Sequence, residues 1–228
     1  MRFALLSLLV LALPAWPQET LRVAVAANFK PTLAAINTLF ERQTGHRVLL
    51  SSASTGVLYS QITQGAPFDI FFSADRETAQ RLENAGTGSA AFCYAVGRLV
   101  LVGGELARLA DPNSSLAIGN PASAPYGRAA LEVLQRNQFK AGAARKLVRG
   151  NNVAQAYQFW YSKAVELALI PRSLAPGAAA VIPGQWHAAL AQYAVVLQPG
   201  AALDAYLKWI RSDTVRTLIN EAGYEPCP

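Results

Sequence analysis

The chain has 228 residues, of which 52% are hydrophobic and 15% are charged, a composition that excludes a disordered protein and allows one or two domains with full cores. The formal net charge is +6, yet Lys and Arg are scattered, and the densest basic group is only Arg145, Lys146 and Arg149. We therefore interpret the excess charge as a solvated basic surface and expect no nucleic-acid partner.

The N-terminal residues are typical of a secretory signal peptide. Arg2 is followed by an apolar run from Ala4 to Leu13 and by the small-residue region Pro14-Ala15. This run is too short to span a membrane, and no later segment reaches the roughly 18 apolar residues that a span needs. We expect residues 1–18 to be the signal peptide and the mature protein to lie in the periplasm.

The chain contains two cysteines, Cys93 and Cys227. Export would allow them to form a disulfide bond, but the sequence does not decide whether they meet. They form no Cys-x-x-Cys pair, so neither redox chemistry nor a zinc site is supported.

Strand and helix patterns alternate in the first part of the chain. Strands are predicted over residues 22–27, 47–52 and 68–72, and helices over residues 31–43, 56–64 and 77–84. Thr44-Gly45 ends the first helix, and Ser73-Ala74-Asp75 caps the third. Such alternation predicts a parallel sheet with helices on its faces and with ligand sites at the carboxyl ends of the strands.

The same alternation starts again in the middle of the chain. Strands are predicted over residues 94–102, 116–119, 165–170 and 192–197, and helices over residues 127–135, 153–163, 203–211 and 214–223. We interpret this as two similar α/β lobes joined by two short strand crossings near 94–102 and 193–197. The predicted first lobe comprises residues 19–93 and 194–228, and the second lobe comprises residues 94–193.

One kind of join occurs four times: an apolar run, then small or polar residues, then the start of a helix. The four joins lie at residues 23–28, 48–56, 116–127 and 150–153. Each join offers free main-chain N–H groups and the positive end of a helix dipole. A site where several such ends converge binds an anion without a charged side chain, so the sequence predicts a binding protein for a small oxyanion.

The residues at these joins resemble a known family. The sequence carries, in order, Ala26-Ala27-Asn28-Phe29, Ser54-Thr55-Gly56, Gly65-Ala66-Pro67-Phe68-Asp69, Ser73-Ala74-Asp75, Asn120-Pro121, Pro125-Tyr126-Gly127 and Ala222-Gly223-Tyr224. This ordered set is similar to that of the periplasmic molybdate-binding proteins of molybdenum ABC importers. The resemblance implies a type II periplasmic-binding-protein fold, with two mainly parallel α/β lobes and the ligand in the cleft between them.

The resemblance also implies the contacts to the oxyanion. Asn28, with its own N–H or that of Ala27, and Thr55 would come from the first lobe, and Tyr126 and Val153 from the second, largely through main-chain N–H groups. Ser54 and Asn152, which precede Thr55 and Val153, are also candidate contacts. These groups would contact the oxygens of molybdate or tungstate and not the metal itself. The family has no catalytic residue and no cofactor, acts as a monomer, and delivers its ligand to an ABC permease at the inner membrane.

The sequence departs from the family at one position. Many relatives have a Tyr donor in the segment that matches Leu169-Ile170-Pro171, where this chain has Pro171, which lacks even an N–H group. One hydrogen-bond donor is therefore expected to be missing.

Plainer interpretations of these residues remain open. Asn28, Thr55 and Asn152 could only cap helices, and Tyr126 could be a surface residue of a Pro-Tyr-Gly turn. Asp69 is interpreted as structural and Asp75 as a cap or turn former.

Other functions also remain open. The ligand could be another small oxyanion, such as sulfate or thiosulfate, or phosphate or an organic acid. An organic acid calls for an Arg clamp, however, and the only Arg at the helix start of a join is Arg128. A secreted enzyme is disfavoured, because His46 and His187 accompany no nucleophile motif. An interaction module without a ligand would leave the four joins unexplained.

Overall fold

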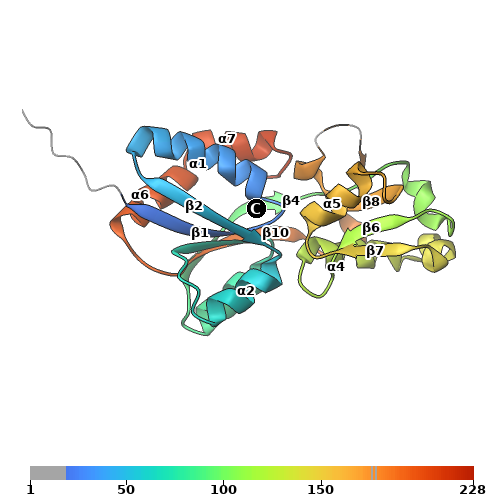
Figure 1. Ribbon diagram of the computed structural model, residues 1–228, viewed down its shortest axis with the longest axis horizontal. Helices are drawn as coiled ribbons and strands as arrows, with labels where there is room; N and C mark the ends of the chain where they lie inside the picture. Colours follow the sequence, from blue (N-terminus) through green and yellow to red (C-terminus); the bar gives the residue numbers. More distant parts are fainter. Residues whose placement is uncertain (1–18, 176, 178) are drawn as a thin grey trace, which may run out of the picture.

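The computed structural model describes residues 19–175, 177 and 179–228, so the predicted signal peptide lies outside the described residues. The chain forms two five-stranded sheets, each covered by helices, which lie side by side as two lobes (Figure 1). Within the described ranges, no helix combines the length and the apolar character needed to cross a membrane.

The first sheet has the strand order β2-β1-β3-β10-β4. Its strands are β1 (Thr20–Ala26), β2 (Arg47–Ala53), β3 (Ile70–Ser73), β4 (Ser89–Gly97) and β10 (Leu190–Val196). β1 pairs in parallel with β2 and β3, whereas β10 runs antiparallel to β3 and β4. The sheet is therefore parallel on one side and antiparallel on the other, where the returning strand enters.

Helices cover both faces of this sheet. Apolar side chains of α1 (Lys30–Thr44), α6 (Ala201–Ile210) and α7 (Asp213–Glu221) pack on one face, and those of α2 (Thr55–Thr63) and α3 (Arg76–Asn84) pack on the other. Their apolar residues recur at helical spacing and give each helix one buried stripe.

The second sheet has the order β7-β6-β8-β5-β9 and repeats the pattern of the first. Its strands are β5 (Leu99–Val102), β6 (Leu116–Gly119), β7 (Leu147–Gly150), β8 (Leu167–Pro171) and β9 (Ala180–Val181). All residues of β5, β6 and β8 are buried, as expected for central strands covered on both faces. The covering helices are α4 (Pro125–Leu134) on one face and α5 (Val153–Tyr161) largely on the other.

Short 3₁₀ segments complete the second lobe and its connections. They are η1 (Leu106–Ala110), η2 (Asn137–Ala144), η3 (Arg172–Leu174) and η4 (Gly184–Trp186). The sequence pattern predicted neither these segments nor β7 and β9. Arg145, one of the three grouped basic residues, follows η2 and is 7% exposed, with its guanidinium donating to the carbonyls of Gly142 and Leu109. It therefore stabilises a loop and contributes little to a basic surface.

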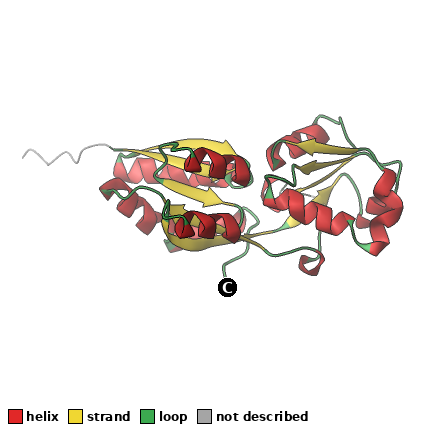
Figure 2. Ribbon diagram, turned by 90° about the horizontal axis from the view of Figure 1, so that it is seen from below, coloured by secondary structure: helices red, strands yellow, loops and turns green. Residues whose placement is uncertain are grey.

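The chain crosses between the sheets at two places. It leaves the first sheet at Arg98, between β4 and β5, and returns through residues 182–189 to β10 (Figure 2). The single strand predicted over residues 94–102 is thus two strands in different sheets. Gly97 stands at the break, where a Cβ would collide with the hydroxyl of Tyr126. We propose that these two passages divide the lobes and serve as the hinge.

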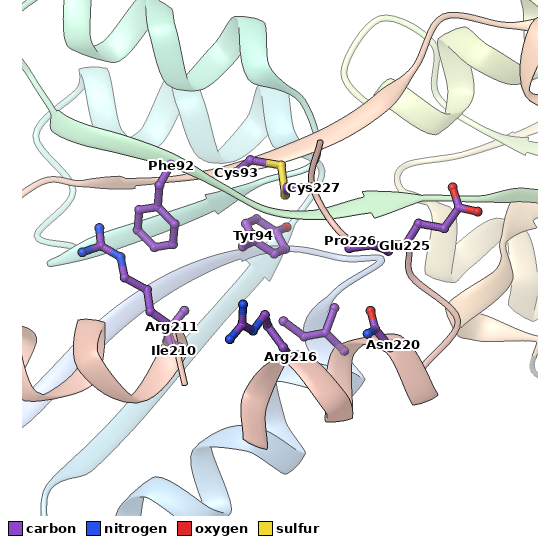
Figure 3. A pocket seen from close by; sticks show the side chains of 11 residues that line it. Phe92, Cys93, Tyr94, Ile210, Arg211, Arg216, Asn220, Glu225, Pro226 and Cys227 are labelled. Carbon is purple, nitrogen blue, oxygen red and sulfur yellow. A yellow bond between two sulfur atoms is a disulfide. The ribbon is translucent and has the colours of Figure 1, made fainter. Parts of the chain in front are cut away.

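The two cysteines form a disulfide bond, with their Cα atoms 6.1 Å apart. The bond fastens the C-terminal residues to β4, and Figure 3 shows it beside Tyr94 and Pro226. The main chains of Glu225 and Val96 also pair as an isolated bridge. The last residues are therefore held to the first lobe both covalently and by hydrogen bonds.

Replacing Cys227 with Ser is expected to lower the free energy of unfolding by about 2–4 kcal/mol, because a link between residues 134 positions apart restricts the unfolded chain. Urea unfolding followed by circular dichroism measures this. The matched control is the double variant Cys93→Ser/Cys227→Ser, which should lose no more than the single variant, since either change removes the same bond. A loss below about 0.5 kcal/mol, within the range of surface substitutions, would contradict the expectation.

Candidate anion-binding site

The four joins meet at one small cavity between the lobes. Its lining contains all seven residues that the sequence proposed for the site. The lining residues are Ala26, Ala27, Asn28, Ser54, Thr55, Ala74, Ala124, Pro125, Tyr126, Asn152 and Val153. The carboxyl ends of β1, β2, β3, β6 and β7 precede these residues, as the rule for parallel sheets predicts.

Helix beginnings supply unpaired N–H groups at this cavity. Thr55 and Val153 are the first residues of α2 and α5, and Tyr126 is the second residue of α4. Main-chain N–H groups in a first turn have no partner inside their own helix. The N–H of Asn28, in the turn after β1, also has no partner among the described residues. Four donors from four segments are therefore available to one ligand.

Two hydroxyl groups add to these donors. Ser54 is 4% exposed, and its Oγ has no hydrogen-bond partner among the described residues. It precedes α2 without capping it, because no N–H group donates to its side chain. The Oγ1 of Thr55 accepts the N–H of Ala74 at 3.1 Å, which leaves the hydroxyl proton free to donate. A buried hydroxyl without a partner is costly, which favours a ligand at this position.

The side chain of Asn28 is engaged behind the cavity. Its Nδ2 donates to the Oε1 of Gln192 at 2.7 Å and to the hydroxyl of Tyr224 at 3.2 Å. The N–H of Ala27 is also engaged, because it donates to the carbonyl of Ala53 at 2.9 Å. Of the donors that the family resemblance implied for this turn, the main-chain N–H of Asn28 is the one without a partner.

Tyr126 and Asn152 hold helix beginnings in place. Tyr126 is 1% exposed and its hydroxyl accepts from the Nε2 of Gln192 at 3.0 Å, so it is no surface residue, and burial raises the pKa of its phenol. Asn152 accepts the N–H of Gln155 at 3.0 Å and thus caps α5. The side chains of both residues therefore serve the structure, and the main-chain N–H of Tyr126 remains for the cavity.

The lobes also contact each other around the cavity. The N–H of Gly56 donates to the carbonyl of Ser123 at 2.8 Å, and Arg128 pairs with Asp75 at 2.6 Å. A Cβ on Gly56 would lie 3.1 Å from the Cα of Ser123, so a side chain there would press against the second lobe. Because its guanidinium pairs with Asp75 and it does not line the cavity, Arg128 is no clamp for a carboxylate.

The remaining sequence candidates lie outside the cavity lining. Asp75 caps α3 by accepting the N–H of Thr78 at 2.9 Å, and Asp69 accepts the N–H of Arg22 at 2.6 Å, as their structural interpretations predicted. Pro171 ends β8 and does not line the cavity. The rings of His46 and His187 contact main-chain atoms of Glu19 and Ala188.

The electrostatics of the cavity rest on neutral groups. Tyr126 is the one ionisable residue in the lining, and its raised pKa keeps it neutral. Among the described residues, no group of three His, Cys, Asp or Glu could hold a metal ion. Neutral donors facing a small space suit a compact anion. The lining contains no acid, histidine or lysine that could accept a proton from one of its hydroxyl groups.

A second cavity of about 290 Å³ lies beside the disulfide bond (Figure 3). Arg211 and Arg216 border it, but the guanidinium of Arg211 stacks 4.4 Å from the ring centre of Phe92, and Arg216 pairs with Asp213. Both cations are thus engaged by neighbouring side chains. The unpaired N–H groups of the helix beginnings and the Oγ of Ser54 lie at the cavity between the lobes instead.

Replacing Ser54 with Ala is expected not to lower the free energy of unfolding, because the hydroxyl makes no hydrogen bond with the described residues and its burial without a partner is itself costly. Asn152→Ala is the matched comparison and should lower it by about 1 kcal/mol, since that side chain caps α5. Urea unfolding of the ligand-free proteins tests both. A Ser54→Ala loss as large as that of Asn152→Ala would mean that Ser54 is a structural cap.

Comparison with known proteins identifies the family. A family model described as bacterial extracellular solute-binding protein matches residues 21–225. The chain is 35% identical to the molybdate-binding protein ModA of Azotobacter vinelandii over 223 residues, which cover 89% of this chain and 88% of the relative. It is 36% identical to ModA of Rhodobacter capsulatus over 237 residues, which cover 97% and 94% of the two chains.

Solved structures agree with this result. The periplasmic molybdate-binding protein of Azotobacter vinelandii superposes with a TM-score of 0.82 at 32% identity, over 91% of this chain and 100% of that one. The sulfate-binding protein SubI of Mycobacterium tuberculosis superposes with a TM-score of 0.76 at 13% identity, over 92% and 87% of the two chains, and so shares the fold alone. These matches confirm the predicted two-lobed α/β fold. The chain belongs to the family of bacterial extracellular solute-binding proteins, whose members bind solutes for transport and are not enzymes.

Proposed function

We propose that this protein is the periplasmic substrate-binding component of an ABC importer and that it binds molybdate in the cavity between its lobes. The observation that carries the proposal is the convergence of four unpaired N–H groups and two hydroxyls on one cavity whose lining has no charged side chain. The relatives named as molybdate-binding proteins support this choice of anion.

The arrangement of donors suits a doubly charged tetrahedral anion. Burial of an isolated dianion is very costly, so each ligand oxygen needs hydrogen bonds from the protein. Bonds to a charged acceptor are about twice as strong as bonds between neutral groups. Thr55, Tyr126 and Val153 place donors at the positive ends of three helix dipoles, which adds to the stabilisation of negative charge.

The same donors favour one size and protonation state of anion. Donors fixed on helices fit the longer metal–oxygen bonds of molybdate and tungstate and fit the shorter bonds of sulfate poorly. A protonated phosphate needs an acceptor for its proton, and the lining contains no carboxylate. We infer that molybdate and tungstate both bind and that sulfate and phosphate bind weakly.

The biological setting follows from the same proposal. Residues 1–18 would direct export to the periplasm and be removed there. Both lobes of one chain supply the donors, so a monomer suffices for binding. The closed form, with Gly56 in contact with Ser123 and Arg128 paired with Asp75, would deliver the anion to the permease at the inner membrane.

Isothermal titration of the mature protein with molybdate is expected to show tight one-to-one binding, because one cavity collects the donors from both lobes. Sulfate in the same buffer should give no measurable heat. Tight sulfate binding would assign the protein to another oxyanion importer, and heat from neither anion would contradict the oxyanion site.

Replacing Ser54 with Ala should weaken molybdate binding by about tenfold or more, since a hydrogen bond to a charged group contributes roughly 1.5–3 kcal/mol. The same titration measures this on a protein whose stability is expected to be no lower than that of the wild type. The control is Ser60→Ala, which removes an exposed hydroxyl on the same helix that bonds to the carbonyl of Gly56. Equal affinities for the wild type and Ser54→Ala would remove Ser54 from the donor set.

The affinity for molybdate should stay constant from about pH 6 to pH 9. The reason is that Tyr126 is the one ionisable residue in the lining, and burial raises its pKa above the usual value near 10, so the phenol stays protonated throughout. Titrations at fixed ionic strength across this range test the expectation. A tenfold loss between pH 7 and pH 9 would show that a titrating group takes part.

A further inference from the structure

Gln192 is a buried polar residue to which the proposed function gives no role. Its exposed fraction is 0%. It lies in β10, the strand by which the chain returns from the second sheet to the first. A buried amide is costly unless its oxygen and its N–H groups are paired, so its partners are informative.

The side-chain amide of Gln192 forms hydrogen bonds with residues of both lobes. Its Oε1 accepts from the Nδ2 of Asn28 at 2.7 Å and from the hydroxyl of Tyr94 at 2.9 Å, both in the first lobe. Its Nε2 donates to the hydroxyl of Tyr126 at 3.0 Å, and Tyr126 lies in the first turn of α4 in the second lobe. Two of the residues that offer main-chain N–H groups to the cavity thus share one amide as a partner.

An irregularity in the sheet brings these groups together. Gln192 pairs with Ala95, but the next residue, Tyr193, pairs with Cys93, so Tyr94 is an extra residue on β4. Such a bulge re-aims side chains and often lies next to a functional site. Space for the cluster also depends on Gly97, because a Cβ there would lie 2.6 Å from the Nε2 of Gln192.

The Asn28 turn is held from a second side as well. The hydroxyl of Tyr224 donates to the carbonyl of Asn28 at 2.8 Å, and the hydroxyl of Ser173 also reaches that carbonyl, at 3.1 Å. The Nδ2 of Asn28 is engaged by Gln192 and its carbonyl accepts from two hydroxyls, so its main-chain N–H is the one donor that Asn28 keeps for the cavity. The turn is therefore fixed in one orientation by groups that do not line the cavity.

We propose that Gln192 is a positioning residue that fixes the N–H groups of Asn28 and Tyr126 relative to each other across the hinge, and so sets the spacing of donors that selects the anion. The proposal rests on the proposed function, because it assigns to Gln192 the geometry of that same site. Gln192 acts through Asn28 and Tyr126, since it is absent from the cavity lining.

The test replaces Gln192 with Met, which keeps the length of the side chain and removes its hydrogen bonds. Molybdate affinity is expected to fall about tenfold or more, and the ratio of molybdate to sulfate affinity should fall with it, because the donor spacing is no longer fixed. The matched control is Asn37→Leu. Asn37 is 4% exposed in α1 of the first lobe and bonds to the hydroxyl of Tyr206 at 2.6 Å, away from the cavity. It should lower stability and leave both affinities unchanged.

The outcomes separate the two proposals. A folded Gln192→Met protein with wild-type affinity and wild-type selectivity overturns the role of Gln192, while the proposed function stands. A wild-type protein that binds no molybdate overturns the proposed function, and a measurement without ligand then decides on Gln192.

That measurement is a double-mutant cycle on the unfolding free energy of ligand-free protein, with Tyr94→Phe and Tyr126→Phe. Each variant removes one hydroxyl that meets Gln192, so the proposal predicts that their effects are not additive. Additive effects overturn the proposal. The cycle also tests the proposal if Gln192→Met does not fold, because Phe retains the aromatic ring at positions 94 and 126.

Discussion

The main-chain N–H groups at the beginning of a helix have no partner within that helix, and the architecture of this protein brings three such beginnings and one turn to the same point. Each lobe alone supplies only half of these donors. The strands that precede them must end at facing edges of two sheets, and the two chain passages at Arg98 and residues 182–189 must hold those edges together. Two lobes with the same arrangement of parallel and antiparallel strands meet that requirement.

Neutral side chains surround these donors and hold them in place through hydrogen bonds. The phenols of Tyr94, Tyr126 and Tyr224 are buried, and burial raises the pKa of each, so none of them brings a negative charge toward the cavity. The carboxylate of Asp75, in the first lobe, pairs with Arg128 of the second lobe. Glycine allows the close approach of the backbone: a Cβ on Gly127 would collide with the carbonyl of Gly119, so α4 could not begin so close to β6.

Much of the fold was predictable because its elements are strongly patterned. The helix over 31–43 was predicted from apolar spacing and a Gly end signal, and the structure places it at Lys30–Thr44. β7 was not predicted, because it is only four residues long and contains Arg149, so the segment shows too short an apolar pattern to indicate a strand. The single strand predicted over 94–102 was wrong, because a continuous apolar run does not show where a chain changes sheets at Gly97 and Arg98.

The candidate site shows a similar limit. All seven residues that the family resemblance implied line the cavity, and the four joins that contain them are visible in the sequence as helix starts after apolar strands. The sequence could not show that the amide of Asn28 points away toward Gln192, or that Ala27 donates to Ala53. Gln192 itself was read only as part of a strand, since its role depends on a bulge opposite Tyr94 and on partners as distant in sequence as Asn28. Long-range side-chain pairing of this kind leaves no local signal.

The first lobe is discontinuous, and this has a consequence for how the protein reaches its native state. The chain builds β1 to β4, then the whole second lobe, and only afterwards β10, α6, α7 and the segment that carries Cys227. A chain that emerges N-terminus first can therefore complete the second lobe while the first still lacks β10, which lies between β3 and β4. Between those moments, β3 and β4 each present an unpaired edge, which is the kind of surface that aggregates. The bond between Cys93 and Cys227 can form only after the C-terminal segment has emerged, so it closes the first lobe around a second lobe whose sequence is already complete.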